Sequence, residues 1–222
     1  MSSALRAPSG AFYFDLASPL AYLASERALQ VLTSERAAVQ WRPVLASGLP
    51  GGETFEAFRC GNEAEVFRAE VERRAAELGL PQLRWPEPFP FDSGAAMRVA
   101  TFAASIGRAL PFAQAAFRQA FAGGRSLAER DNVLIAAAAC EMHPRAVLAA
   151  IERDSLRADL DEATREAARA GVRDVPAVLI EPADGSAPRV LHGERSLEQA
   201  GDLLRREPDD AAAASAANGA RA

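Results

Sequence analysis

The segment Phe12-Tyr-Phe-Asp-Leu-Ala-Ser-Pro-Leu-Ala-Tyr-Leu23 contains both the start of the fold and its first candidate functional group. A short apolar and aromatic run predicts a buried strand over residues 11–16, and the dipeptide Ser18-Pro19 follows at once. Serine before proline is typical of a helix start, with serine as the N-cap and proline in the first turn. We therefore expect a strand that leads directly into a helix over residues 19–32.

A second strand is expected at Val39-Gln-Trp-Arg-Pro-Val44, and it completes a strand–helix–strand unit of the size that a parallel crossover requires. Beyond it, alanine-rich segments with apolar residues three and four apart alternate with short turns, which indicates helices. A proline-rich connector over residues 81–91 cannot be helical. The predicted helices span residues 56–78, 94–105, 111–122, 127–140, 144–151 and 155–170.

The end of the chain returns to strands. The segment Val172-Arg-Asp-Val-Pro-Ala-Val-Leu-Ile180 and residues 189–192 predict two short strands joined by a turn, and a last helix is expected over residues 196–206. The alanine-rich tail, residues 207–222, has no large apolar anchor, so we expect it to be disordered.

This order of elements predicts an α/β fold. Residues 11–46 and 171–206 would form a thioredoxin-like domain, and residues 47–170 an all-helical insertion domain.

Composition and charge exclude several classes of partner. The 25 basic residues are all arginine and are scattered among 30 acidic ones, for a net charge of −5, so a basic surface for nucleic acid is not expected. No apolar run of about 18 residues and no signal peptide is visible, which favours a cytoplasmic protein without a membrane partner. Cys60 and Cys140 lie far apart and only two histidines occur, so we expect no dithiol and no metal site.

Two features could carry chemistry. Ser18 places a hydroxyl at a helix N-terminus, where free N–H groups and the helix dipole favour an anion such as a thiolate. The dipeptide Val175-Pro176 opens a strand, which is unusual unless its peptide bond is cis or the strand edge binds something. The structural alternatives are a simple N-cap for Ser18, a plain loop proline for Pro176, and a partly exposed strand-end residue for the nearby His192.

The segment Phe14-Asp-Leu-Ala-Ser-Pro-Leu-Ala-Tyr-Leu-Ala24 resembles the opening motif of the 2-hydroxychromene-2-carboxylate isomerases and kappa-class glutathione transferases. These proteins are DsbA-like thioredoxin folds in which serine occupies the position of the first redox cysteine. The similarity continues in order through Trp41-Arg-Pro43, residues 89–98 and residues 167–177, and it covers about residues 11–206.

This resemblance implies that Ser18 hydrogen-bonds the sulfur of bound glutathione, or of another low-molecular-weight thiol, and keeps it as a thiolate. The backbone of Val175, before an expected cis Pro176, would pair with the cysteinyl part of the tripeptide. The thiolate would add to a 2-oxo or 2-hydroxy acid of the kind found in aromatic catabolism and then depart, so that the reaction is an isomerisation.

One segment departs from the family pattern. The family usually has Gly-x-Asp-Arg-Leu before the last helix, with a carboxylate for the glutamyl ammonium, whereas this chain has Gly193-Glu-Arg-Ser-Leu197. Arg195 therefore stands in the place of the aspartate, unless Glu194 serves after a shift of one residue. We expect the glutamyl end at Gly193, Glu194, Arg195 and Ser196.

Other functions remain open alternatives. The chain could be a kappa-type glutathione transferase or peroxidase, or a non-catalytic thioredoxin-like binding module. A dithiol oxidoreductase is not expected because residue 18 is serine. We expect a small-molecule substrate, and a homodimer stays an open alternative.

Overall fold

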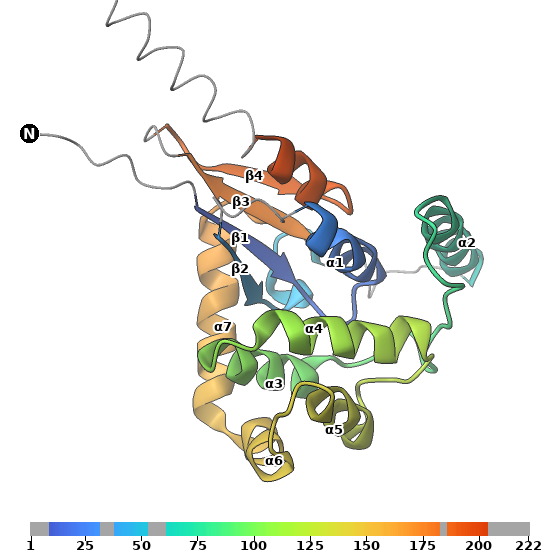
Figure 1. Cartoon of the computed structure of the whole chain (residues 1–222), viewed down its shortest axis with the longest axis vertical. Helices are drawn as coiled ribbons and strands as arrows, with labels where there is room; N and C mark the ends of the chain where they lie inside the picture. Colours follow the sequence, from blue (N-terminus) through green and yellow to red (C-terminus); the bar gives the residue numbers. More distant parts are fainter. Residues whose placement is uncertain (1–8, 32–37, 53–60, 183–185, 204–222) are drawn as a thin grey trace, which may run out of the picture.

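The computed structural model describes residues 9–31, 38–52, 61–182 and 186–203. At its centre is a four-stranded mixed sheet in the order β2-β1-β3-β4 (Figure 1). β1 and β2 are parallel, β3 is antiparallel to β1, and β4 is antiparallel to β3. The strands are β1 (Ser9–Phe14), β2 (Ala38–Pro43), β3 (Ala177–Glu181) and β4 (Arg189–His192).

Helix α1 (Pro19–Val31) follows β1, and a last helix begins at residue 196 and is described to residue 203. Between β2 and β3 the chain is helical, and most of these helices lie below the sheet in the view of Figure 1. They are α2 (Gly61–Glu77), α3 (Gly94–Ser105), α4 (Ala109–Phe117), α5 (Arg130–Ala138), α6 (Pro144–Glu152) and α7 (Asp154–Arg169), with a 3-10 turn at Ala46–Gly48.

Side chains alternate along a strand, so the residues of β1 contribute to two cores on opposite faces of the sheet. Phe12 and Phe14 belong to the main core, which also contains residues of α1, α3, α4 and the last helix. The Phe12 ring packs edge-on against Trp41 at 4.7 Å between ring centroids. Ala11 and Tyr13 point the other way and belong to a smaller core with Ala167 of α7.

Helix α7 is amphipathic in the way that its sequence predicts. Its buried residues Leu156, Leu160, Thr164 and Ala167 recur every three or four positions, so they form one stripe, and most of the remaining residues are charged. Since helices of segment 47–170 share the main core with β1, that segment packs directly on the sheet. Its separate folding as an insertion domain stays a prediction.

The observed order of elements confirms the predicted α/β thioredoxin-like fold. The helix starts at Pro19 and Pro144, and the bounds 94–105, agree with the sequence prediction. No helix among the described residues is long and apolar enough to cross a membrane. Cys60, the first residues of the helix predicted from residue 56, and the tail 207–222 lie outside the described residues.

Several predicted boundaries are wrong. The strand predicted from residue 172 begins only at Ala177, directly after Pro176, because proline has no N–H for the ladder. The helix predicted to residue 122 is α-helical only to Phe117 and continues as a π-helix over Arg118–Ala122. The helix predicted from residue 127 begins at Arg130.

The start of α3 is capped by the side chain of Asp92 rather than by that of Ser93. Ser93 occupies the N-cap position but makes no side-chain cap hydrogen bond. The Gly94 N–H instead donates to Asp92 Oδ1 at 2.8 Å. The Ser93 hydroxyl is engaged elsewhere, because it hydrogen-bonds the carboxyl of Asp15.

Candidate functional site

Ser18 lies at the junction of β1 and α1 and caps that helix. Its Oγ accepts a hydrogen bond from the Ala21 N–H at 3.2 Å, which satisfies one of the free N–H groups of the first turn. The side chain is buried, with 1% exposed, but it lines a cavity. Ser18 is therefore an N-cap, as the structural alternative has it, and it also contributes to the wall of a cavity.

The segment before β3 lies next to Ser18, as the resemblance implies. The Val175–Pro176 peptide bond is cis. Ser18 Oγ is 3.5 Å from the carbonyl oxygen of Val175, a long contact for an O–H donor. The Val175 N–H donates to Asp174 Oδ1 at 2.7 Å. The carbonyl of Val175 is therefore the more open of its two backbone groups.

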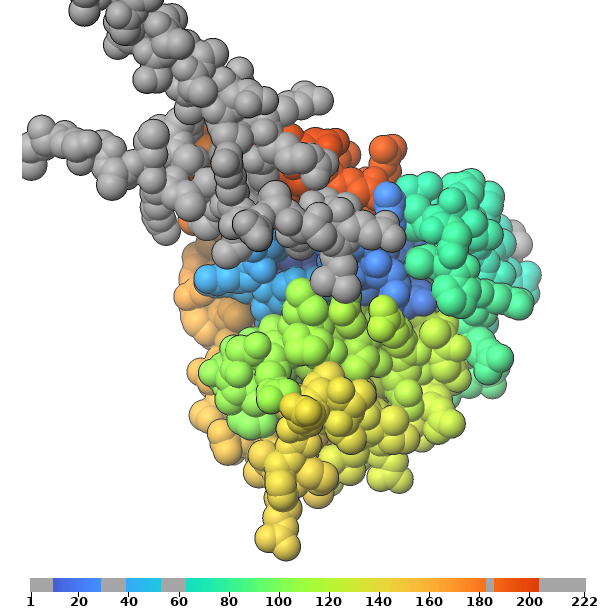
Figure 2. All heavy atoms as spheres, viewed as in Figure 1, coloured from blue at the N-terminus to red at the C-terminus, as the bar shows by residue number. Residues whose placement is uncertain are grey.

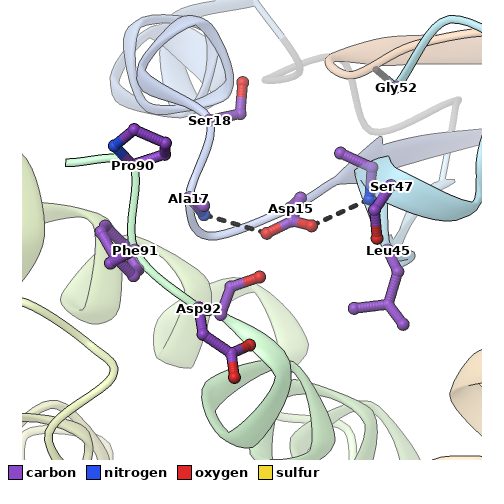
Figure 3. Close-up of a pocket in the computed structure, with 11 residues that line it drawn as sticks. Asp15, Ala17, Ser18, Leu45, Ser47, Gly52, Pro90, Phe91 and Asp92 are labelled. Atoms are coloured by element: carbon purple, nitrogen blue, oxygen red, sulfur yellow. Dashed lines mark hydrogen bonds between the residues drawn. The ribbon is translucent and has the colours of Figure 1, made fainter. Parts of the chain in front are cut away.

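A cavity of about 340 Å³ lies beside Ser18, and Figure 3 shows the residues around it. Three segments far apart in sequence form its wall: the β1–α1 loop, the turn after β2, and the end of the proline-rich connector. The lining residues are Asp15, Ala17, Ser18, Leu45, Ala46, Ser47, Gly52, Pro90, Phe91, Asp92 and Ser93. A ligand held at Ser18 would have room for a second molecule here.

Asp15 is the buried charge of this cavity, with only 3% of the residue exposed. Its two oxygens accept hydrogen bonds from the N–H groups of Ala17 and Ala46, each at 2.9 Å, and so connect two walls of the cavity (Figure 3). Burial raises the pKa of the Asp15 carboxyl, and the nearby carboxylate of Asp92 raises it further. The N–H donors and Ser93 act in the opposite direction.

A second cavity, of about 460 Å³, lies on the other side of the start of α1, between α1 and α2. Its lining residues include Leu20, two residues after Ser18, and charged side chains of both signs, among them Arg73, Arg74 and Glu194. In the space-filling view of Figure 2, atoms of α2 lie directly against those of α1, and residues of α2 line the cavity between the two helices.

Glu194 and Arg74 form an ion pair in this second cavity. Arg74 Nε donates to Glu194 Oε1 at 2.7 Å. The pairing with Glu194 and Glu77 raises the pKa of the Arg74 guanidinium, so it stays positively charged. The other carboxylate oxygen, Glu194 Oε2, is buried and has no hydrogen-bond partner within the part of the chain that the structure describes. Glu194 therefore directs a carboxylate inward.

The residues next to Glu194 in the sequence do not share its ion pair with Arg74. Arg195, which stands where the family has aspartate, is directed outward with 66% of its side chain exposed, and it lies 3.6 Å from Glu198. Gly193 has φ +90°, a conformation that favours glycine, and its N–H donates to the Pro176 carbonyl at 2.9 Å. Ser196 is buried, and its hydroxyl has no partner among the residues described.

His192 and two further side chains outside the site have structural roles. His192 is exposed at the end of β4, where its Nε2 accepts the N–H of Arg173 at 3.0 Å. Cys140 is a buried free thiol, and burial raises its pKa. Trp85 packs on Phe89 in the connector and carries the guanidinium of Arg68 on its ring at 5.3 Å. No three His, Cys, Asp or Glu side chains in the described ranges are grouped as metal ligands.

Sequence reasoning missed two residues of these cavities. Asp15 is inside the quoted motif, and its position three residues before Ser18 at a strand end was the available signal. Arg74 lies in a run of charged helix residues that reads as an ordinary solvated face, and its partner Glu194 is 120 residues away. No pattern in the sequence connects those two.

Comparisons with known proteins agree with this fold. The family model of the DSBA-like thioredoxin domain matches residues 11–205. No curated protein sequence matches the chain. Among solved structures, a 2-hydroxychromene-2-carboxylate isomerase has TM-score 0.73 at 18% identity, covering 91% of this chain and 98% of the other.

A probable DsbA oxidoreductase from Streptomyces coelicolor has TM-score 0.72 at 20% identity, covering 90% of this chain and 89% of the other. The cytosolic disulfide reductase DsbM from Pseudomonas aeruginosa, in a structure with GSH, has TM-score 0.62 at 18% identity, with coverage of 89% and 95%. At these identities the likeness establishes a shared fold.

Proposed function

This chain belongs to the DSBA-like thioredoxin domain family, and we propose that it is a glutathione-dependent isomerase in which the reactive thiol arrives with the ligand. The observation that carries the proposal is the position of Ser18. A hydroxyl stands at the N-terminus of α1, beside the cis peptide bond at Pro176 and in the wall of a cavity. A dithiol in the first turn of α1 is absent from the sequence, which reads Ser18-Pro-Leu-Ala21.

The sulfur of glutathione would be held at Ser18. Because Ser18 Oγ already accepts from Ala21 N–H, its own proton is free to be donated, and its 3.5 Å contact with the Val175 carbonyl is easily exchanged for a better acceptor. A thiolate is such an acceptor, and the helix dipole adds to its stabilisation. The Val175 carbonyl, once released, would accept the cysteinyl N–H of the tripeptide.

The glutamyl end would occupy the second cavity. The glutamyl group of glutathione carries an ammonium and a carboxylate, and the cavity offers Glu194 for the first and Arg74 for the second. Leu20 lines this cavity and Ser18 lines the first one, so a tripeptide of about 10 Å could reach from one to the other. In this proposal the carboxylate that binds the glutamyl ammonium is that of Glu194, one residue before the position that Arg195 occupies.

The thiolate would then act as the nucleophile. It adds to a carbon–carbon double bond of an α,β-unsaturated substrate in the first cavity, the bond rotates as a single bond, and the thiolate leaves again. Glutathione is regenerated, so it serves as a cofactor. The isomerase and the GSH-bound reductase among the structural neighbours support this choice of chemistry, and reduced glutathione is maintained in the cytoplasm, where we place the protein.

Calorimetry with glutathione tests the proposal. We expect binding by the wild-type protein and a large loss of affinity in Ser18→Ala. Absence of binding by the wild type would leave a non-catalytic module as the better description. Turnover of 2-hydroxychromene-2-carboxylate with glutathione unconsumed would identify an isomerase, whereas stoichiometric consumption would identify a transferase.

A further inference from the structure

Asp15 is a buried carboxyl group that the proposed reaction has not used. It forms part of the cavity wall that also contains Ser18. The two residues are close in the chain as well as in space, since the Ser18 N–H donates to the Asp15 carbonyl at 3.0 Å in a tight turn. In Figure 3 the Asp15 carboxylate lies between Ala17 and the turn that holds Leu45 and Ser47, and it is hydrogen-bonded to both sides.

We propose that Asp15 holds the proton that the bound thiol loses at Ser18. In this step the S–H bond of the ligand breaks, its electron pair stays on sulfur, and the proton forms an O–H bond on the Asp15 carboxylate. The step rests on the proposed function, because it requires a thiol at Ser18. No other reactant is needed, and the proton returns to sulfur when the ligand leaves.

The physical reason is that two negative charges in one buried site disfavour each other. If Asp15 stayed ionised, its charge would oppose formation of a thiolate at Ser18, and a thiolate would in turn raise the pKa of Asp15. Burial and Asp92 already raise that pKa in the free protein, which favours the protonated carboxyl. The thiol and Asp15 would therefore share a single proton, and binding would place it on Asp15.

The hydrogen bonds of Asp15 are compatible with this role. Ala17 N–H, Ala46 N–H and the Ser93 hydroxyl contact the carboxyl. Two carboxylate oxygens offer about four lone-pair positions, so one remains for a proton. The charged groups that act on the carboxyl include Asp92, on the loop before α3, whose charge also favours the protonated form. The β2 side of the cavity contributes the uncharged Leu45, Ala46 and Ser47.

Proton counting by calorimetry tests the proposal. Glutathione is titrated into the protein at pH 7 in buffers of different ionisation enthalpy, and the thiolate is followed by its ultraviolet band. A thiol that becomes a thiolate on binding releases about one proton unless a protein group takes it up. We expect a thiolate band with close to zero protons released by the wild type, and about one proton released by Asp15→Asn.

Two controls complete the experiment. Asp92→Asn removes a charge that helps to raise the pKa of Asp15 but leaves the accepting carboxyl in place, so we expect it to release fewer protons than Asp15→Asn. S-methylglutathione has no thiol proton, so it should bind without a thiolate band and without the infrared signal of a newly protonated carboxyl that glutathione produces. If Asp15→Asn does not fold, the wild-type proton count together with this infrared signal decides the question.

The outcomes separate this inference from the proposed function. A thiolate band accompanied by release of about one proton from the wild type would overturn the role of Asp15 and leave glutathione binding at Ser18 intact. Equal proton counts in the wild type and Asp15→Asn would do the same. No binding of glutathione by the wild type would overturn both.

Discussion

Replacing Ser18 by alanine should raise the pKa of the bound glutathione thiol. A hydrogen bond to a charged acceptor contributes about 1.5–3 kcal/mol, and about 1.4 kcal/mol corresponds to one pKa unit. The pKa of the bound thiol should therefore rise by about 1–2 units in Ser18→Ala, and affinity at neutral pH should fall roughly tenfold to a hundredfold. Titration of the ultraviolet thiolate band against pH, with glutathione saturating, measures this pKa directly.

The same substitution also removes an N-cap, so stability needs a matched control. Loss of the hydrogen bond from Ala21 N–H at 3.2 Å should cost about 1 kcal/mol in the free energy of unfolding. Ser25→Ala is the control, because Ser25 is equally buried on the same helix and its Oγ donates to the Tyr22 carbonyl at 2.8 Å, away from both cavities. It should lower stability by a similar amount and leave the thiol pKa unchanged. An unchanged thiol pKa in Ser18→Ala, or an equal shift in Ser25→Ala, would refute the reasoning.

Three further predictions follow from the structure. Glu194→Gln should weaken glutathione binding about tenfold, because it loses a charge-assisted contact. Arg195→Ala should change the affinity less than about twofold, because that side chain is 66% exposed. Equal effects of the two substitutions in titration calorimetry would contradict the inward position of Glu194. Phe117→Ala should lower the free energy of unfolding, measured in urea, by about 3–5 kcal/mol. The reason is that Phe117 is fully buried and its ring centroid lies 6.0 Å from that of Phe14. A loss below about 1 kcal/mol would contradict this packing. Because the folded state raises the pKa of Asp15 above its ordinary value of 3.8, the folded protein binds this proton more tightly than the unfolded chain does. The stability of the wild type relative to Asp15→Asn, measured by unfolding at several pH values, should therefore fall as pH rises from 3.8 through the folded pKa. A rise in relative stability over that window would show that folding lowers the pKa of Asp15.

Local signals were sufficient for the beginning of the fold. The Ser18-Pro19 dipeptide places the start of α1 because serine caps and proline occupies the first turn, and α1 begins at Pro19. The same reasoning located α6, where His143 precedes Pro144 and caps the helix through its ring nitrogen. Such elements are predictable because the groups that decide them are adjacent in sequence.

The site is less predictable because its contacts are long-range. The Asp15 carboxylate meets Ala46 N–H at a separation of 31 residues, and Arg74 meets Glu194 at a separation of 120. Ser93 occupies the N-cap position of α3, but its side chain hydrogen-bonds Asp15, 78 residues earlier, instead of the helix. The motif therefore predicted where Ser18 and Pro176 lie, whereas the charge environment around them needed the folded chain.

A structure of the protein with glutathione bound tests the central claim most directly. The account predicts the glutathione sulfur within hydrogen-bonding distance of Ser18 Oγ, the cysteinyl N–H on the Val175 carbonyl, and the glutamyl ammonium at Glu194. A glutathione molecule bound elsewhere, or one whose sulfur is directed away from Ser18 into solvent, would contradict it.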